Sequence, residues 1–518
     1  MSKKPVKSTL VVGGATLVSR IFGYARDAII FIVFGANAGT DAFFVAFRIP
    51  NFLRRLFAEG AFSQAFVPVM TSHLHSSKSD FKRLIDHVTG LLSIILLIIT
   101  ALGILCSPWL IHIFAPGFND PAQELLASDM LKITFPYALF ISLTALSGSI
   151  LNIHQKFAVP ALTPVLLNLS LIGAAVWLSP QMENPVTALA WGVFVAGLAQ
   201  LLFQIPFLIK AHSLPVPRLT GAKEGVDRIL KLMLPAIFGS SIVQINLLIN
   251  TMIASFLVAG SISWLYISDR FVELPLALFG IATATVILPL LSKQFVSNQL
   301  QEFDRTLQWA LKISLLISIP ATLGLVVLSA PILFTLVQYR EFSLFDTQMA
   351  TLSLMAYALG LPAFIFIKVL APGFYSRQDT KTPVKVGVLV MIINIILNLF
   401  FVWLWSRLEL PGAHAGLALA TSLSAYINAG LLFILLRKAN VLQANSGRLT
   451  LSLKVFVSSL AMLMFLWWIN PTPEVWSSWN SLTRFGSLTA LVISGISIYA
   501  GLLVILGLRP SQFRLQSH

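Results

Sequence analysis

Fourteen long apolar segments, separated by short loops, run through the whole of this chain. A membrane-spanning helix needs about 20 predominantly apolar residues, and most of the segments reach that length. The 518 residues are 57% hydrophobic and only 11% charged, whereas soluble domains carry about 25% charged residues. These features exclude a soluble enzyme, a disordered chain and a coiled coil. They predict an all-α polytopic membrane protein with 14 transmembrane helices.

The apolar segments can be placed to within a few residues at each end. They lie near 10–34, 40–70, 88–114, 128–153, 158–179, 185–209, 232–258, 262–291, 307–336, 344–374, 386–406, 412–436, 455–470 and 485–508. The loops between them leave no room for a separate soluble domain. The longest apparent linkers, at 210–231 and 437–454, are both basic.

Basic residues divide unequally between the two sides of the predicted membrane domain. Of 35 Lys and Arg, 23 lie in the N-terminus, the even-numbered loops and the C-terminus, and three lie in the odd-numbered loops. The other nine lie inside apolar segments. Because cytoplasmic loops carry the excess of Lys and Arg, we expect a multi-pass membrane protein with both termini in the cytoplasm. Orientation thus accounts for the net charge of +15, and no nucleic-acid partner is expected.

A weak internal repeat relates the two halves of the chain. Matching residues lie about 222 positions apart: Gln155 and Gln378, Pro160 and Pro383, Arg48 and Arg270, Pro68 and Pro289, Asp27 and Asn250. The separation equals six helices and predicts two six-helix lobes, a layout of transporters. We expect an N-lobe over 1–209, a cytoplasmic linker over 210–231 and a C-lobe over 232–436. Residues 437–518 would hold the last two helices and a cytoplasmic tail.

Ionisable groups inside apolar segments are the most informative residues, because each costs about 2.5–3.5 kcal/mol on insertion scales. Lys132, Lys312 and Lys368 are expected to reach the interface by snorkelling. Snorkelling fails for deeper groups, since Arg54 lies about 14 residues, or roughly 20 Å, into its segment. The basic residues left after this step are Arg20, Arg26, Arg48, Arg54, Arg55 and Arg270.

Two interpretations of these arginines remain open. They form structural ion pairs with acids of the same segments (Asp27, Asp41, Glu59, Asp269 and Glu273), or they line a water-filled cationic cavity. Arginine suits bidentate recognition of phosphate, and the six basic groups outnumber the five acids, so we favour a cavity for an anionic cargo. The sequence has no Gly-rich phosphate loop, paired-Cys metal site or nucleotide-binding domain, so neither a cofactor nor enzymatic activity is expected.

A family resemblance is carried by SRIFGYARDAIIFIVFGANAGTDAFFVAFRIPNFLRRLFAEGAFSQAFVPV at 19–69. This stretch closely resembles the first two helices of the MurJ/MviN family of the MOP exporter superfamily, the lipid II flippases of bacterial cell-wall synthesis. YISDRFVELPLALFGIATATVILPLLSK and QDTKTPVKVGV resemble the family's eighth and eleventh helices. The resemblance covers essentially the whole chain, and related multidrug exporters lack the RRxFAEGAFSQAFVP run.

The resemblance implies a flippase that moves undecaprenyl-diphosphate-linked peptidoglycan precursor from the inner to the outer leaflet by alternating access. The family's substrate-binding arginines match Arg20, Arg26, Arg54 and Arg270. Its gating and cavity residues match Ser19, Asp27, Asp41, Glu59, Ser263 and Glu273. The implied partners are lipid II, membrane lipids and the cell-wall synthesis machinery, with the protein acting as a monomer.

One departure from the family pattern concerns cation binding. Where family members commonly read LVDT, this chain reads LINT, with neutral Asn250. Only a weak cation site made of Asn250, Asn394, Asn398 and Thr421 would remain, so no metal site is predicted. Two rival functions stay open. A drug or oligosaccharide-lipid exporter would need a differently charged cavity, and a membrane glycan or lipid transferase would need acidic metal-binding loops.

Overall fold

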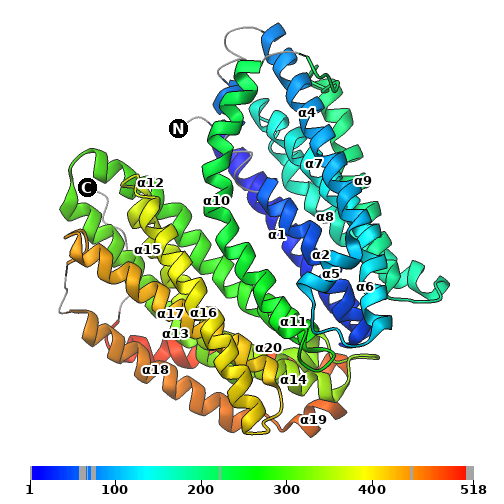
Figure 1. Cartoon of the computed structure of the whole chain (residues 1–518). Helices are drawn as coiled ribbons and strands as arrows, with labels where there is room; N and C mark the ends of the chain where they lie inside the picture. Colours follow the sequence, from blue (N-terminus) through cyan, green and yellow to red (C-terminus); the bar gives the residue numbers. More distant parts are fainter. Residues whose placement is uncertain are drawn as a thin grey trace. The chain divides into compact units, whose positions relative to one another are not determined.

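A computed structural model describes residues 3–57, 66, 68–71, 78–220, 223–443 and 447–508. The described elements are helices, and these residues contain no β-strand (Figure 1). The chain divides into two compact units, unit 1 over Met1–Ser263 and unit 2 over Trp264–His518. Each unit is described by itself.

Unit 1 contains helices α1 to α10. They are α1 (Lys3–Phe34), α2 (Ala38–Phe57), α4 (Lys78–Leu105), α5 (Ser107–Phe114), α6 (Pro121–Thr134), α7 (Pro136–Ile153), α8 (Ala158–Gly173), η1 (Ala174–Leu178), η2 (Ser179–Gln181), α9 (Thr187–Lys210) and α10 (Lys223–Ala254). A buried apolar cluster joins α4, α7, α9 and α10 through Leu84, Ile150, Leu208 and Ile229. This packing accounts for the stability of helices whose outer faces are exposed.

The second set of helices begins at Ser261 and continues through unit 2. These are α11 (Ser261–Pro275), η3 (Leu276–Ile281), α12 (Ala282–Val296), α13 (Leu300–Leu336), α14 (Leu344–Leu359), α15 (Leu361–Tyr375), α16 (Lys381–Arg407), α17 (Ala413–Lys438), α18 (Gly447–Ile469), α19 (Pro473–Ser478) and α20 (Ser481–Ile505). Leu291, Leu307, Val369 and Leu432 belong to a buried cluster that joins α12, α13, α15 and α17.

The starts of the helices recur along the chain at a nearly constant separation. α11, α14 and α16 each begin 223 residues after α2, α6 and α8. α1 and α10 have the same length, 32 residues. Gln155 and Gln378 both have positive φ, 59° and 60°, in the turns that follow α7 and α15. This register supports the internal repeat predicted from the sequence.

The predicted single segments at 128–153 and 344–374 are each divided into two helices. Pro136 lies at the start of α7 and Pro362 at the start of α15. Proline lacks the N–H that continues a helical ladder, so a new helix begins at each proline. The two divisions occupy corresponding places in the repeat.

Eleven spans in the described part of the chain are long and apolar enough to cross a membrane. They match eleven of the fourteen predicted segments, and the segments without a match are those of α1, α2 and α10. α1 and α2 carry the arginines and acids discussed above, which lower their hydropathy. In α10 the described apolar stretch is Gln244–Ala254, because several side chains before it lie outside the described part of the chain. By length and composition, the described residues therefore support eleven membrane helices.

One predicted segment extends beyond the described residues, and one predicted linker is partly helical. α2 ends at Phe57, and 58–65 of the predicted segment 40–70 lies outside the described residues. α10 begins at Lys223, so the last part of the predicted linker 210–231 is helical. Val226 in that part is buried in an apolar cluster of unit 1, and this packing favours the longer helix.

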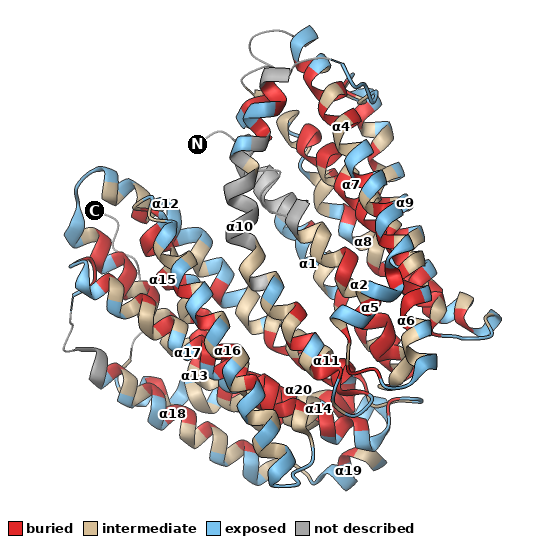
Figure 2. Ribbon diagram, viewed as in Figure 1, coloured by how far each residue is buried: buried red, intermediate tan, exposed pale blue. Residues whose placement is uncertain are grey.

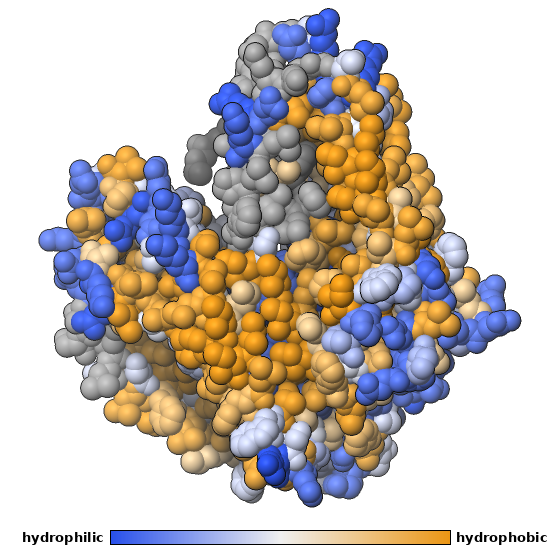
Figure 3. All heavy atoms as spheres, in the orientation of Figure 1, coloured by the Kyte–Doolittle hydropathy of each residue, from blue (hydrophilic) through white to orange (hydrophobic). Residues whose placement is uncertain are grey.

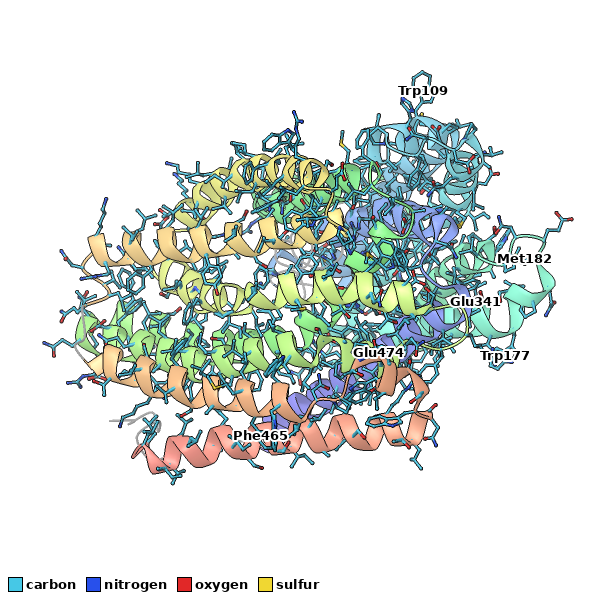
Figure 4. All side chains as sticks on the ribbon, turned by 90° about the horizontal axis from the view of Figure 1, so that it is seen from below. Trp109, Trp177, Met182, Glu341, Phe465 and Glu474 are labelled. Atoms are coloured by element: carbon cyan, nitrogen blue, oxygen red, sulfur yellow. The ribbon has the colours of Figure 1, made fainter. Side chains whose placement is uncertain are left out.

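Large apolar side chains are exposed along many helices (Figure 2). Trp109 and Trp177 are 73% and 71% exposed and project away from the ribbon (Figure 4). In Figure 3, hydrophobic atoms cover much of the visible helix faces and hydrophilic atoms gather at helix ends. Apolar surface of this extent marks contact with another apolar phase, as expected for helices in a lipid bilayer.

Candidate functional site

A buried ion pair in α1 involves two neighbouring residues, Arg26 and Asp27. Arg26 Nη2 and Nε donate to Asp27 Oδ1 at 2.6 and 2.9 Å. Arg26 Nη1 donates to Asn168 Oδ1 of α8 at 3.1 Å. Arg26 and Asp27 are only 6% and 1% exposed. A buried charge needs such partners, because desolvation of an unpaired ion is costly.

Asn168 also connects this pair to the preceding turn of α1. Its Nδ2 donates to the backbone carbonyl of Ser19 at 3.0 Å, so one amide holds two turns of α1 against α8. Arg20, the next residue, is half-buried and has no hydrogen bond or ion pair with the described residues. The guanidinium of Arg20 is therefore available for an anion, whereas that of Arg26 is already engaged.

Asp41, near the start of α2, accepts hydrogen bonds from the first residues of α11. Its Oδ2 accepts from the backbone N–H of Gly260 at 2.7 Å. Its Oδ1 accepts from the backbone N–H and the hydroxyl of Ser263 at 2.8 and 2.6 Å. Helix N-termini present free N–H groups and a positive dipole end, so a carboxylate is well placed there. Asp41 and Ser263, both predicted gating residues, are thus brought into direct contact and are almost fully buried.

The three arginines of α2 have different partners. Arg54 Nε donates to Asn51 of the same helix at 2.7 Å. Arg48 donates to Thr251 of α10, and Arg55 Nη1 lies 3.4 Å from Gln244 of the same helix. Arg48 and Arg55 therefore tie α2 to α10, whereas the bond of Arg54 stays within α2. Glu59, one of the acids considered as a partner of these arginines, lies outside the described residues.

In unit 2, Arg270 pairs with Glu273 one turn further along α11. Arg270 Nη1 and Glu273 Oε2 are 2.7 Å apart, and their side chains are 29% and 41% exposed. Residues three apart on a helix are neighbours on its surface, so this pair needs no second helix to form. It is a local, half-exposed pair, unlike the buried pair of unit 1.

The residues considered for a weak cation site lie on different helices and have different hydrogen-bond partners. Asn398 Nδ2 donates to Asn394 Oδ1 at 3.1 Å, and Asn394 Nδ2 donates to Ser424 at 3.1 Å. Thr421 donates to the carbonyl of Leu417 within α17 at 2.9 Å, and Asn250 belongs to unit 1. Among the residues described, no group of three or more His, Cys, Asp or Glu is arranged to hold a metal ion.

Asn168 is a residue of the site that the sequence analysis missed. It lies in a strongly apolar helix and is 5% exposed. Polar side chains inside apolar helices are usually hydrogen-bonded within the protein. The position of this asparagine in the sequence could therefore have indicated a contact between helices. Thr40 was also missed, and its hydroxyl lies 3.0 Å from the hydroxyl of Ser263.

Several known proteins are similar to the chain over its full length. "Probable lipid II flippase MurJ" of Vibrio cholerae is 46% identical over 98% of this chain and 97% of its own length. The protein of the same description from Haemophilus influenzae is 43% identical over 95% of this chain and 98% of its own length.

Solved structures of other proteins are also similar to the chain. A lipid II flippase MurJ in an inward closed conformation is 30% identical, covers 96% of this chain and 98% of its own, and has a TM-score of 0.80. An inward-facing multidrug resistance MATE family transporter of the MOP superfamily has a TM-score of 0.68 over 83% of this chain and 98% of its own. At 14% identity, this second similarity shows the fold alone.

The family described as "Lipid II flippase MurJ" matches residues 30–485. The match covers most of the chain, from the last five residues of α1 through all of α2 and the helices of unit 2 up to the start of α20. The chain therefore belongs to the MurJ family.

Proposed function

We propose that this chain is a lipid II flippase, a transporter and not an enzyme, which moves the undecaprenyl-diphosphate-linked peptidoglycan precursor to the outer leaflet. The observation that carries the proposal is identity of 46% over 98% of the chain to a relative named as a probable lipid II flippase. The solved structure named as a lipid II flippase, at 30% identity over 96% of this chain, supports the same class.

In the proposed mechanism, Arg20, Arg26, Arg54 and Arg270 bind the diphosphate. Half-buried Arg20 and half-exposed Arg270 are ready for an anion. Arg26 would share its fork of donors between Asp27 and a phosphate oxygen of the cargo. Charge-assisted hydrogen bonds of this kind contribute about 1.5–3 kcal/mol each.

The proposed gates use the acids and hydroxyls in the absence of cargo. Asp27 and Glu273 would neutralise Arg26 and Arg270, and Glu59 would act likewise near the end of α2. Asp41 and Ser263 would hold the connection between α10 and α11, which their hydrogen bonds support. The backbone carbonyl of Ser19 accepts from Asn168, which also accepts from Arg26. Cargo binding would weaken these contacts and shift the population toward the other state of an alternating-access cycle.

The proposed topology has fourteen spanning helices, with α1, α2 and α10 added to the eleven apolar spans. At about 1.5 Å per residue, 32-residue helices such as α1 and α10 are long enough to cross a bilayer. The lobes would be 1–209 and 232–436, and both termini would lie in the cytoplasm of the inner membrane, as the loop charges indicate. A reporter that works only in the cytoplasm, fused after Arg514, should be active, and activity of the periplasmic counterpart alone would contradict the orientation.

The membrane potential is the proposed energy source, because moving one charge is worth about 2.3 kcal/mol per 100 mV. Asn250 lacks the carboxylate that a sodium site would use, so transport should depend little on sodium. A vesicle transport assay at fixed potential that shows an absolute sodium requirement would contradict this part of the mechanism.

Depletion of the protein in its host tests the function itself. The precursor should accumulate in the inner leaflet, where an externally added enzyme that cleaves lipid II in the outer leaflet cannot reach it. Resupply of the chain should restore cleavage. If the added enzyme cleaved the precursor equally well before and during depletion, the proposal would be overturned.

A further inference from the structure

A cavity of about 380 Å³ lies in unit 2 among α13, α15, α17 and α18. Its volume is within the range of about 300–1,000 Å³ that is usual for small-ligand sites. The walls are mainly apolar and include Leu315, Phe366 and Phe433. None of the residues that line it comes from α20, so it is not a groove between the last two helices.

A glycine on α17 lies in the wall of the cavity and faces open space. A Cβ atom added at Gly430 would meet no other atom within 4 Å, and Gly430 lies in the wall of the cavity beside Ala429. Glycine is less favourable than alanine in a helix interior, and a void loses contacts that a larger side chain would make. The chain therefore keeps an unfilled volume at a position where a larger side chain would fit.

One charged residue, Lys312 of α13, is among the residues that line the cavity. It is half-buried and has no hydrogen bond or ion pair with the described part of the chain. The lining contains no acid, and its other polar groups include Ser452 and Tyr426. The Tyr426 hydroxyl already donates to the carbonyl of Leu359 at 2.9 Å. Among the residues that the structure describes, the ammonium group of Lys312 thus has no anionic partner beside this apolar cavity.

We propose that the cavity binds an anionic membrane phospholipid, with an acyl chain against Gly430 and the head-group phosphate on Lys312. A soluble metabolite would need several polar contacts, whereas this wall offers one cation and an apolar surface. α17 ends at Lys438 and α15 at Tyr375, so the cavity lies toward the end of unit 2 where these helices stop. On the proposed topology that end is cytoplasmic, where basic groups attract anionic lipids. The lipid would be a resident ligand, distinct from the transported cargo.

Native mass spectrometry of the purified full-length protein tests the site. The probes are phosphatidylglycerol and phosphatidylcholine with identical acyl chains. The wild type should retain one phosphatidylglycerol more tightly than phosphatidylcholine. Equal retention of both would overturn the proposal, as would stoichiometric displacement of phosphatidylglycerol by added undecaprenyl diphosphate, which would assign the cavity to the cargo.

Two variants test separately the contribution of the Lys312 charge and that of the open space beside Gly430. Lys312→Gln should weaken phosphatidylglycerol retention about tenfold, the size of one charge-assisted contact, and leave phosphatidylcholine unchanged. Lys368→Gln, an exposed lysine of α15 outside the cavity, is the matched control. Gly430→Leu should fill the cavity and abolish specific retention of either lipid. Gly501→Leu, at a glycine of α20 that also has no atom within 4 Å of the added Cβ, should have no effect.

Thermal unfolding in detergent checks that each variant is folded. The filled variant, Gly430→Leu, should unfold at or above the wild-type temperature without lipid and should lose the stabilisation that phosphatidylglycerol gives the wild type. Undiminished lipid stabilisation in both Gly430→Leu and Lys312→Gln would overturn the assignment. The proposed flippase activity does not depend on either result.

Discussion

Arg26–Asp27 in unit 1 and Arg270–Glu273 in unit 2 are ion pairs of nearly equal length in different surroundings. Their N–O distances are 2.6 and 2.7 Å. The side chains of the first pair are 7% and 1% exposed, and those of the second are 29% and 41% exposed. The difference between the two pairs is therefore one of burial and not of distance.

Burial changes what each pair can do. A buried pair has given up its hydration, so removal of either partner leaves an uncompensated charge in a medium of low polarity. A half-exposed pair exchanges its partner for water at little cost. Arg26 is therefore suited to hold α1 against α8 until a strong anion competes, and Arg270 is suited to exchange Glu273 for cargo readily. Both roles are compatible with phosphate binding, but only the first also stabilises the fold.

The largest effect is expected for Asp27→Ala. The variant removes the carboxylate that accepts two hydrogen bonds from buried Arg26, and loss of one partner of a buried pair costs about 3–5 kcal/mol. The amount of protein in the membrane and its thermal unfolding temperature in detergent should both fall. Glu273→Ala is the matched control, for which the half-exposed pair predicts a change of less than about 1 kcal/mol. Equal unfolding temperatures for the two variants would break the comparison.

Arg270→Ala should separate folding from transport. The pair it removes is half-exposed, so the protein should accumulate and unfold as the wild type does. Loss of one charge-assisted contact should weaken binding of the lipid diphosphate roughly tenfold or more and abolish support of growth. Complementation and a direct binding measurement check this result. A folded, fully active variant would show that Arg270 is not part of the cargo site.

The sequence predicted the helical class and most helix positions because hydropathy over 20-residue windows is a local property. It also singled out Arg26, Asp27 and Arg270, since charges in apolar segments stand out without knowledge of contacts. Helix boundaries at 223–231 were missed because Val226 is stabilised by packing against distant helices. α1 and α2 are not among the apolar spans because their charged residues lower their hydropathy. The same charges made these helices candidates for the functional site.

The contacts of the site were less predictable than its residues. The sequence offered five acids as candidate partners of the arginines without assigning pairs, and in the structure Arg26 pairs with Asp27. Adjacent residues on a helix do not normally face each other. Asn168, 142 positions away, receives a hydrogen bond from the same guanidinium, and a single sequence carries no record of such a contact. The contact between Asp41 and Ser263 has the same long range.

Lysine at the two arginine positions should sharpen the comparison. Lys keeps the charge but loses the fork of donors that arginine presents. Arg270→Lys should fold normally and support growth in part, because its charge remains available to phosphate. Arg26→Lys should also lower the unfolding temperature, since Arg26 uses three nitrogen atoms on Asp27 and Asn168. Growth assays and thermal unfolding of both variants would show whether the loss of thermal stability is confined to the variant in unit 1.

The smallest effect is expected for Lys132→Ala, which extends the comparison to a third pair. Lys132 and Asp129 lie 2.8 Å apart on α6, with side chains 41% and 52% exposed. Surface pairs of this kind contribute about 0–1 kcal/mol, so growth and unfolding temperature should stay near wild type. The three pairs differ by only about 0.2 Å in length but increase in exposure from Asp27 to Glu273 to Asp129. If burial sets their energies, the stability loss on removing each partner should fall in that order. Equal losses in all three would show that the short distance, and not the surroundings, determines the strength of the pair.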